Sequence, residues 1–257
     1  MLKRILMVVG VLVALLVLVI GGIGFSVFGG LKPIVDGAEL PGGARQIAQG
    51  YTSAFLFDAG DGTYALIDCL QNPGAKEVVD ELARRKASPE AVTAIFLTHG
   101  HPDHIGGCQA FPKAQVYAFQ GDVDPAAGKG RFKGPLPSTM DIPAAQQVKV
   151  TQVLQDGVAV QVGTLSVLPL AVPGHTGGSA TFVVNGVAYM GDNATGAADG
   201  TVRPAPWIFS DDTAENRRSL GALSKRLKAL SPEVKTLAFA HSGPLDGIGG
   251  LAAFEGQ

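Results

Sequence analysis

The sequence predicts a mixed α/β domain in which two β-sheets are covered by helices on their outer faces, preceded by one apolar N-terminal helix. Short runs of β-branched and aromatic residues recur between Gly, Asp and Asn turns, and two segments with helical periodicity interrupt them. Strands mixed with helices in this way fit two sheets with helices outside, and they place function on the loops at strand ends.

Residues 1–31 are predicted to be a transmembrane anchor or a signal sequence. After Lys3 and Arg4, residues 5–31 carry no charge, and as a helix they can cross a hydrocarbon core of about 30 Å. The dense apolar part, residues 5–20, is longer than the roughly 7 to 15 residues of a signal-peptide core, which favours an uncleaved anchor. The two basic residues favour a cytoplasmic N-terminus. The rest of the chain would then face the periplasm or the extracellular side, or be secreted if the segment is cleaved.

Residues 32–50 are predicted to be a linker and edge, and residues 51–257 the main domain. With 46% hydrophobic and 16% charged residues, the chain has enough apolar material for a sizeable core. Asn185-Gly186 is the dipeptide typical of a two-residue hairpin turn. The expected strands are residues 53–57, 64–67, 94–98, 115–119, 165–170, 180–184, 187–190 and 236–240.

Two helices are expected in this domain. The first covers residues 72–86, with Asn72 as N-cap and Pro73 at the first helical position. The second begins at Asp212, has Glu215 in capping-box spacing, and ends before Pro232.

Charge and cysteine content exclude two kinds of site. A net charge of -2 shows no basic excess, which argues against nucleic-acid partners. Cys69 and Cys108 form no C-x-x-C pattern, which argues against a thiolate zinc site. An exported location permits one bridge between them, and two separate buried thiols are the alternative.

The stretch THGHPDHIGG, residues 98–107, holds three of the five histidines in the chain, and neutral histidine is the commonest protein ligand of transition metals. The other two histidines and one aspartate also follow predicted strands. Seven nitrogen and oxygen donors are too many for one tetrahedral ion and suit two. These donors are His99, His101, Asp103, His104, His175, Asp192 and His241.

The H-x-H-x-D-H motif and the three donors that follow it resemble those of the metallo-β-lactamase-fold superfamily of metal-dependent hydrolases, from about residue 45 to the end of the chain. The resemblance implies an αββα sandwich with the site at one edge of the sheets, and therefore a hydrolase domain at 51–257. By analogy, His99, His101 and His175 bind the first metal, Asp103, His104 and His241 bind the second, and Asp192 bridges both. Asp68 matches a position that supports the site from outside the ligands, because a ligating imidazole is oriented through its other nitrogen. A turn-forming aspartate is the alternative.

The expected cofactor is a pair of divalent ions, zinc first and iron or manganese otherwise. Two such ions, two carboxylates and a bridging hydroxide leave a charge of about +1, which favours an oxyanion over a neutral carbonyl. We expect the hydroxide to attack a polarised carbonyl and Asp103 to carry a proton to the leaving group.

Departures from familiar branches narrow the expected substrate. Asp192 disfavours metallo-β-lactamases, some of which have Cys at this position while others lack a bridging carboxylate. Glyoxalase II-like thioesterases share the aspartate but carry a C-terminal helical region, whereas sixteen residues follow His241. Flavin-linked di-iron relatives have Glu in place of His101. A hydrolase of a small ester, lactone or thioester remains the first hypothesis. The alternatives are a mono-iron oxidoreductase like persulfide dioxygenases, a metallo-β-lactamase, and a non-catalytic membrane-tethered module.

Two Gly/Pro-rich loops, residues 122–143 and 204–212, are candidates for the walls of a substrate pocket. Their aromatic residues Phe132, Trp207 and Phe209 are the candidate substrate contacts, and packing into the core is the alternative. The basic residues Lys129, Arg131 and Lys133 could attract a carboxylate, but a solvated loop explains them more simply.

Overall fold

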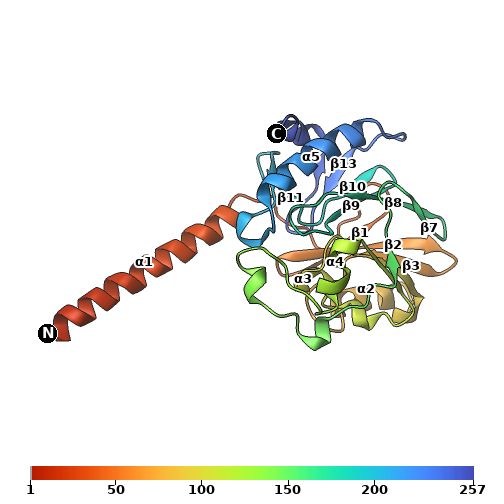
Figure 1. Ribbon diagram of the computed structural model, residues 1–257. Coiled ribbons are helices and arrows are strands. Elements are labelled where there is room, and N and C mark those ends of the chain that lie inside the picture. Colours follow the sequence, from red (N-terminus) through yellow and green to blue (C-terminus); the bar gives the residue numbers. More distant parts are fainter. Residues whose placement is uncertain (1) are drawn as a thin grey trace. The chain divides into compact units, whose positions relative to one another are not determined.

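The computed structural model describes the backbone of residues 2–257, and their side chains except those of Leu2, Lys3, Ile5 and Val8. The chain divides into two compact units, residues 1–31 and residues 32–257 (Figure 1). The first unit contains helix α1, Leu2–Phe28, which is about 40 Å long at 1.5 Å per residue. Its part from Val9 to Phe28 is long and apolar enough to cross a membrane, by length and composition.

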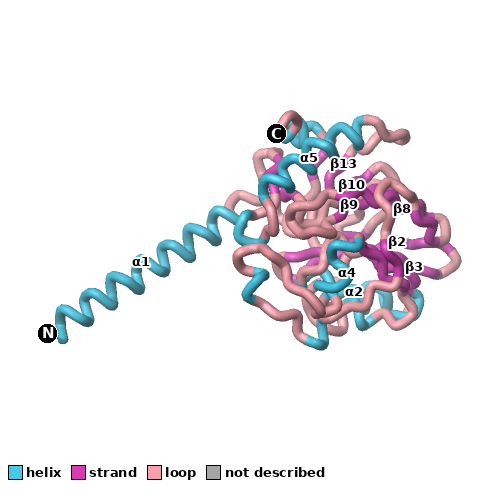
Figure 2. Tube along the Cα trace, viewed as in Figure 1, coloured by secondary structure: helices cyan, strands magenta, loops and turns pink. Residues whose placement is uncertain are grey.

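The second unit contains both strands and helices (Figure 2). Its α-helices are α2 (Lys76–Arg84), α3 (Pro102–Ile105), α4 (Gln120–Ala126) and α5 (Thr213–Lys228). Its 3-10 helices are η1 (Pro89–Ala91), η2 (Cys108–Ala110), η3 (Pro137–Thr139), η4 (Ala144–Gln146), η5 (Trp207–Phe209) and η6 (Gly249–Phe254). Its strands are β1 (Arg45–Gln49), β2 (Thr52–Gly60), β3 (Thr63–Ile67), β4 (Val92–Phe96), β5 (Gln115–Ala118), β6 (Gln152–Val153), β7 (Val160–Val162), β8 (Leu165–Ala171), β9 (Ala180–Val184), β10 (Val187–Tyr189), β11 (Ala194–Gly196), β12 (Val202–Pro204), β13 (Thr236–Ala238) and β14 (Leu245–Asp246).

The strands form two six-stranded sheets and one small ladder within the described residues. The first sheet has the order β1-β2-β3-β4-β5-β6, and the second has the order β14-β13-β10-β9-β8-β7. β3, β4, β5 and β6 pair in parallel, as do β10 and β13, while the other pairs are antiparallel. The pair β11 and β12 stands apart from both sheets.

Three apolar layers hold the sheets and helices together. Phe55 and Phe96 of the first sheet meet Phe182 and Tyr189 of the second in the layer between the sheets. Helix α2 covers the outer face of the first sheet, and helix α5 covers that of the second (Figure 1). Each fully buried apolar side chain of these layers contributes about 1.5 to 3 kcal/mol relative to exposure. The predicted αββα sandwich is confirmed.

The local signals were accurate at one hairpin and one helix start. Asn185 and Gly186 have φ angles of 48° and 79°, the left-handed conformation that a two-residue hairpin turn needs at both positions. The Asp212 side chain caps α5 by accepting a hydrogen bond from the Glu215 N–H at 2.8 Å.

The expected start of the first helix was wrong. Residues 72–75 form a turn, closed by a hydrogen bond from the Ala75 N–H to the Asn72 carbonyl at 3.0 Å. Gly74 and Ala75 have φ angles of 94° and 41°, so the right-handed helix begins only at Lys76. Residues 45–49, within the segment predicted to be a linker and edge, form the edge strand β1.

Candidate metal centre

The H-x-H-x-D-H segment leaves β4 and folds into a tight loop. His99 follows the strand end, His101 precedes the short helix α3, and Pro102 occupies the first position of that helix, where its missing N–H costs nothing. A Cβ at Gly106 would meet the Gln71 carbonyl oxygen, so only glycine allows the loop to approach that segment so closely.

Three imidazoles form what we call the first half of the site: His99, His101 and His175. Their nitrogens converge, with His99 Nε2 3.0 Å from His101 Nδ1, and with His175 Nε2 3.2 Å and 3.1 Å from these two atoms. All three side chains are buried. Although they come from two distant loops, their donor atoms face one small volume.

The second half of the site consists of Asp103, His104 and His241. Asp103 Oδ2 lies 3.7 Å from His104 Nε2 and 3.4 Å from His241 Nε2, and the two Nε2 atoms are 3.4 Å apart. Asp103 is a fifth exposed, whereas His104 is fully buried. This half therefore opens toward solvent on its carboxylate side.

Asp192, in the loop after β10, lies between the two halves. Its Oδ2 is 3.7 Å from His175 Nε2 of the first half and 3.0 Å from His241 Nε2 of the second. Its Oδ1 is 3.3 Å from His104 Nε2. One carboxylate thus contacts both groups of donors, as the bridging role assigned to it requires.

The two halves differ in charge. Burial lowers the pKa of His99 and His175 well below the usual range and that of His101 to about 4, so these rings are neutral donors at pH 7. Burial also acts to lower the pKa of His104 and His241, but the nearby carboxylates, Asp192 foremost, outweigh it and raise both values.

These donors fit a pair of cations. Neutral imidazole nitrogens and carboxylate oxygens are the ligands of zinc, iron and manganese sites. The first half presents three ring nitrogens to one another, and Asp192 Oδ1 is buried without a hydrogen bond although it lies among imidazoles. Cations between these atoms would satisfy the lone pairs that converge there.

Asp68 orients one ligand candidate of the second half. Its Oδ2 lies 2.8 Å from His104 Nδ1 and accepts a hydrogen bond from Thr98 Oγ1 at 2.7 Å, while its Oδ1 accepts one from the Thr98 N–H at 2.8 Å. Asp68 therefore lies beside the site and orients the His104 ring through its Nδ1 atom. The Nε2 atom of His104 then points toward the other donors of the site.

Other histidines are oriented by neutral partners. His175 Nδ1 lies 3.1 Å from Ser210 Oγ, and His241 Nδ1 lies 2.7 Å from the backbone carbonyl oxygen of Tyr51. His101 differs, because its Nε2 is buried and has no hydrogen-bond partner within residues 2–257. Its ring packs against that of Phe132 in a T-shaped arrangement instead, with centroids 4.5 Å apart.

Asp122 supports the loops of the site, a role that was not predicted from the sequence. Its buried carboxylate accepts hydrogen bonds from the Gly100 N–H, the Thr176 hydroxyl and the Gly178 N–H at 2.8, 2.8 and 3.0 Å. It thus ties the loop of His101 to the loop of His175. Burial raises its pKa to about 6, although the three hydrogen bonds oppose that shift. An aspartate in the first turn of a short helix gives no sequence signal for such a role.

The two candidate wall loops meet beside the first half. The Leu136 N–H donates to the Ile208 carbonyl at 3.0 Å, and Asp211 Oδ1 accepts from the Lys133 and Gly134 N–H groups. Of the three aromatic candidates, Phe132 reaches the site, whereas Trp207 is exposed and Phe209 is half-buried. Arg131 pairs with exposed Asp141 at 2.7 Å, which agrees with a solvated loop.

Curated proteins are similar to this chain in sequence. A hydroxyacylglutathione hydrolase of Fuscovulum blasticum is 32% identical over 194 residues, which cover 75% of this chain and 62% of that protein. Another, of Aeromonas hydrophila, is 30% identical over 181 residues, which cover 69% of this chain and 58% of that protein. The chain thus matches about three fifths of the length of these relatives.

Solved structures share the fold. The metallo-beta-lactamase SMB-1, solved in a complex with mercaptoacetic acid, has 25% identity and a TM-score of 0.61, covering 82% of this chain and 80% of its own. The MIM-2 metallo-beta-lactamase has 23% identity and a TM-score of 0.61, covering 82% and 77%. The family pattern described as the metallo-beta-lactamase superfamily matches residues 47–241. This chain belongs to the metallo-beta-lactamase superfamily.

Proposed function

We propose that this chain is a dinuclear metal-dependent hydrolase that cleaves a small ester, lactone or thioester. The observation that carries the proposal is the position of Asp192, whose carboxylate contacts His175 of the first half and both His104 and His241 of the second. A carboxylate shared by two groups of donors supports two cations side by side rather than one.

The chemistry that two bound cations supply is an acidified water and an electrophilic contact for a carbonyl oxygen. The chain's own residues would do the rest. Asp103 is a fifth exposed and lies beside His104 and His241, so it can exchange a proton with a leaving group at the open side of the site. Phe132 packs against His101 in the first half, whose three imidazoles are buried.

Among the three substrate classes, the comparisons favour a thioester. The curated relatives are named for the hydrolysis of hydroxyacylglutathione, in which an acyl group is bound to a thiol sulfur. A β-lactam is the second candidate, because metallo-beta-lactamase SMB-1 shares 25% identity and the fold. We propose zinc as the metal, with iron or manganese as substitutes.

We further propose that α1 anchors the chain in a membrane and that residues 32–257 lie on the periplasmic or extracellular side. Lys3 and Arg4 precede the apolar stretch, as is usual for a cytoplasmic N-terminus. The disulfide between Cys69 and Cys108 supports an oxidising compartment. Protease treatment of intact spheroplasts should digest the hydrolase domain, and digestion only after lysis would overturn this orientation.

The test of the proposed activity uses the full chain in detergent, stripped of metal by a chelator and reloaded with zinc, manganese or iron. We expect about two metal ions per chain by elemental analysis, and hydrolysis of at least one member of a panel of thioesters, lactones, esters and β-lactams that EDTA abolishes.

Three outcomes would overturn the proposal. Less than one metal per chain, with hydrolysis unaffected by EDTA, would remove the metal centre. One iron per chain, with oxygen consumed in the presence of a persulfide, would identify the oxidoreductase alternative. Retained metal without turnover of any substrate would identify a non-catalytic module.

A further inference from the structure

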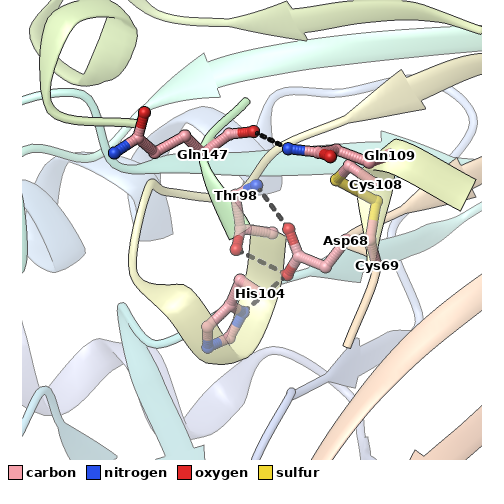
Figure 3. Close-up of a disulfide and its surroundings, with 7 residues drawn as sticks. All are labelled: Asp68, Cys69, Thr98, His104, Cys108, Gln109 and Gln147. Atoms are coloured by element: carbon pink, nitrogen blue, oxygen red, sulfur yellow. Dashed lines mark hydrogen bonds and ion pairs between the residues drawn. A yellow bond between two sulfur atoms is a disulfide. The ribbon is translucent and has the colours of Figure 1, made fainter. Parts of the chain in front are cut away.

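A disulfide joins the two segments that position His104. Cys69 directly follows Asp68, and Cys108 lies four residues after His104, at the end of the metal-site loop (Figure 3). Both cysteines are buried. The bond therefore connects the carboxylate that orients His104 to the loop that carries His104.

The backbone on both sides of Cys69 adopts an unfavourable left-handed conformation. Asp68 and Leu70 have φ angles of 59° and 65°, a left-handed conformation that is unfavourable for a residue with a side chain. Such a conformation persists only where the surroundings enforce it. Two hydrogen bonds do so, from the Cys69 N–H to the His104 carbonyl at 2.6 Å and from the Gly107 N–H to the Leu70 carbonyl at 3.3 Å.

The Asp68 carboxylate depends on this restrained backbone. It reaches His104 Nδ1 and both polar groups of Thr98 at 2.7 to 2.8 Å, so a small rotation at Asp68 would break several contacts together (Figure 3). His104 has no second orienting contact at Nδ1 within the described residues. The disulfide and the two backbone hydrogen bonds hold both members of the Asp68 to His104 pair.

We propose that the Cys69–Cys108 disulfide is a positioning crosslink for the second half of the site, and that breaking it weakens cation binding there more than in the first half. The proposal rests on the proposed metal centre. The first half has its own support, because Asp122 ties its two loops and Ser210 contacts His175. Thr98 lies beside both Asp68 and His99, so a smaller effect on the first half is expected.

The Cys108 side of the disulfide borders a cavity, which is the route we propose for a small reductant. A cavity of about 280 Å³ is lined in part by Cys108, Gln109 and Gln147. A dithiol that attacks there forms a mixed disulfide, and its second thiol then displaces the remaining cysteine. Two electrons and two protons pass to the protein, the Sγ–Sγ bond breaks, two thiols remain, and the reagent becomes a cyclic disulfide.

The experiment measures zinc affinity by competition with a chromophoric chelator, in full-length protein from which the dithiol has been removed under anaerobic conditions. His101→Ala leaves the second half intact, and His241→Ala leaves the first half intact. We expect reduction to weaken zinc binding about tenfold in the His101→Ala protein and less than about threefold in the His241→Ala protein, in the range of other orienting contacts. Mass spectrometry after alkylation counts the thiols formed.

The matched control is the Cys69→Ser/Cys108→Ser variant in each background, which should bind zinc like the reduced protein and should not respond to the dithiol. If the native disulfide resists the dithiol, this variant alone tests the proposal. If the variant does not fold, reduction of the folded native protein tests it. Equal weakening of both halves, or of neither, would overturn the positioning role. Absence of zinc binding in both backgrounds before reduction would instead contradict the proposed metal centre.

Discussion

The two halves of the site reach similar geometry by different physical means. The first half is a cage of three buried, neutral imidazoles, whose pKa values are lowered mainly by burial. The second half is an ion-paired group, in which carboxylates raise the pKa values of His104 and His241 against the effect of burial. A cage of neutral nitrogens is ready for a cation at pH 7, whereas the raised pKa values in the second half make protons compete with a cation there. We expect the first half to bind metal more tightly.

The supports of the two halves also differ. Asp122 holds the first half by tying two loops together, without touching any of the seven donors through its three hydrogen bonds. Asp68 supports the second half by direct contact with His104. The first half should therefore lose its metal-binding geometry when its two loops separate. The second half should lose it when the His104 ring rotates.

Removal of the residue common to both halves should have the largest effect. Asp192→Ala should lower kcat by about a thousandfold, because both cations lose a ligand and the positive charge of the site is no longer balanced. Elemental analysis should show a loss of metal together with activity. Exposed Asp199→Ala is the matched control and should leave both unchanged. Loss of metal from one half alone would contradict the bridging role.

Asp103→Asn should separate catalysis from folding. We expect kcat to fall about a hundredfold, since the amide cannot carry a proton, while the free energy of unfolding changes by less than about 1 kcal/mol because the side chain is partly exposed. Turnover and urea unfolding of the same protein give both numbers. Equal losses of activity and stability would indicate a structural metal.

The seven donors that the sequence singled out lie close together in the structure, in loops that each follow a strand. Strand ends such as Phe96 and Ala238 are recognisable from apolar runs, and His99 and His241 stand a few residues beyond them. In the αββα fold, these ends lie at one edge of the sandwich. The distances between donors then follow from the fold rather than from local sequence.

The supports could not be predicted equally well. Asp122 meets Gly100 and Gly178 through contacts between distant loops, and no periodicity encodes such contacts. The start of α2 was missed because Gly74 and Ala75 adopt left-handed backbone conformations, which a favourable Asn-Pro pair did not reveal. The pairing of Cys69 with Cys108 was left open by the sequence, since it depends on how closely the metal-site loop approaches β3.

Asp122 should give the first half a pH-dependent support. Its pKa is raised to about 6 in the folded protein, against 3.8 for an unperturbed aspartate, so the folded state binds the proton more tightly than the unfolded chain. Stability is then greatest below the unfolded pKa and falls as pH rises through the folded pKa. Between pH 4.5 and 7 the free energy of unfolding of the metal-free protein should fall by about 2 kcal/mol relative to that of Asp122→Asn, whose amide cannot titrate. Urea unfolding at several pH values measures this difference, and a difference of the opposite sign would contradict the raised pKa.

The smallest expected effect concerns His101, which packs on Phe132 and lacks a hydrogen bond at Nε2 within residues 2–257. Phe132→Leu keeps an apolar contact but loses the aromatic ring, so the imidazole of His101 gains freedom to turn away from the donors. We expect zinc affinity of the first half, measured in the His241→Ala background, to fall about fivefold, less than the tenfold or more typical of a lost hydrogen-bonding partner. Phe254→Leu, a change of the same kind in the layer under α5, should leave the affinity unchanged while lowering stability similarly. If both variants bind zinc equally, packing against Phe132 does not orient His101, and convergence of the three imidazoles alone fixes the first half.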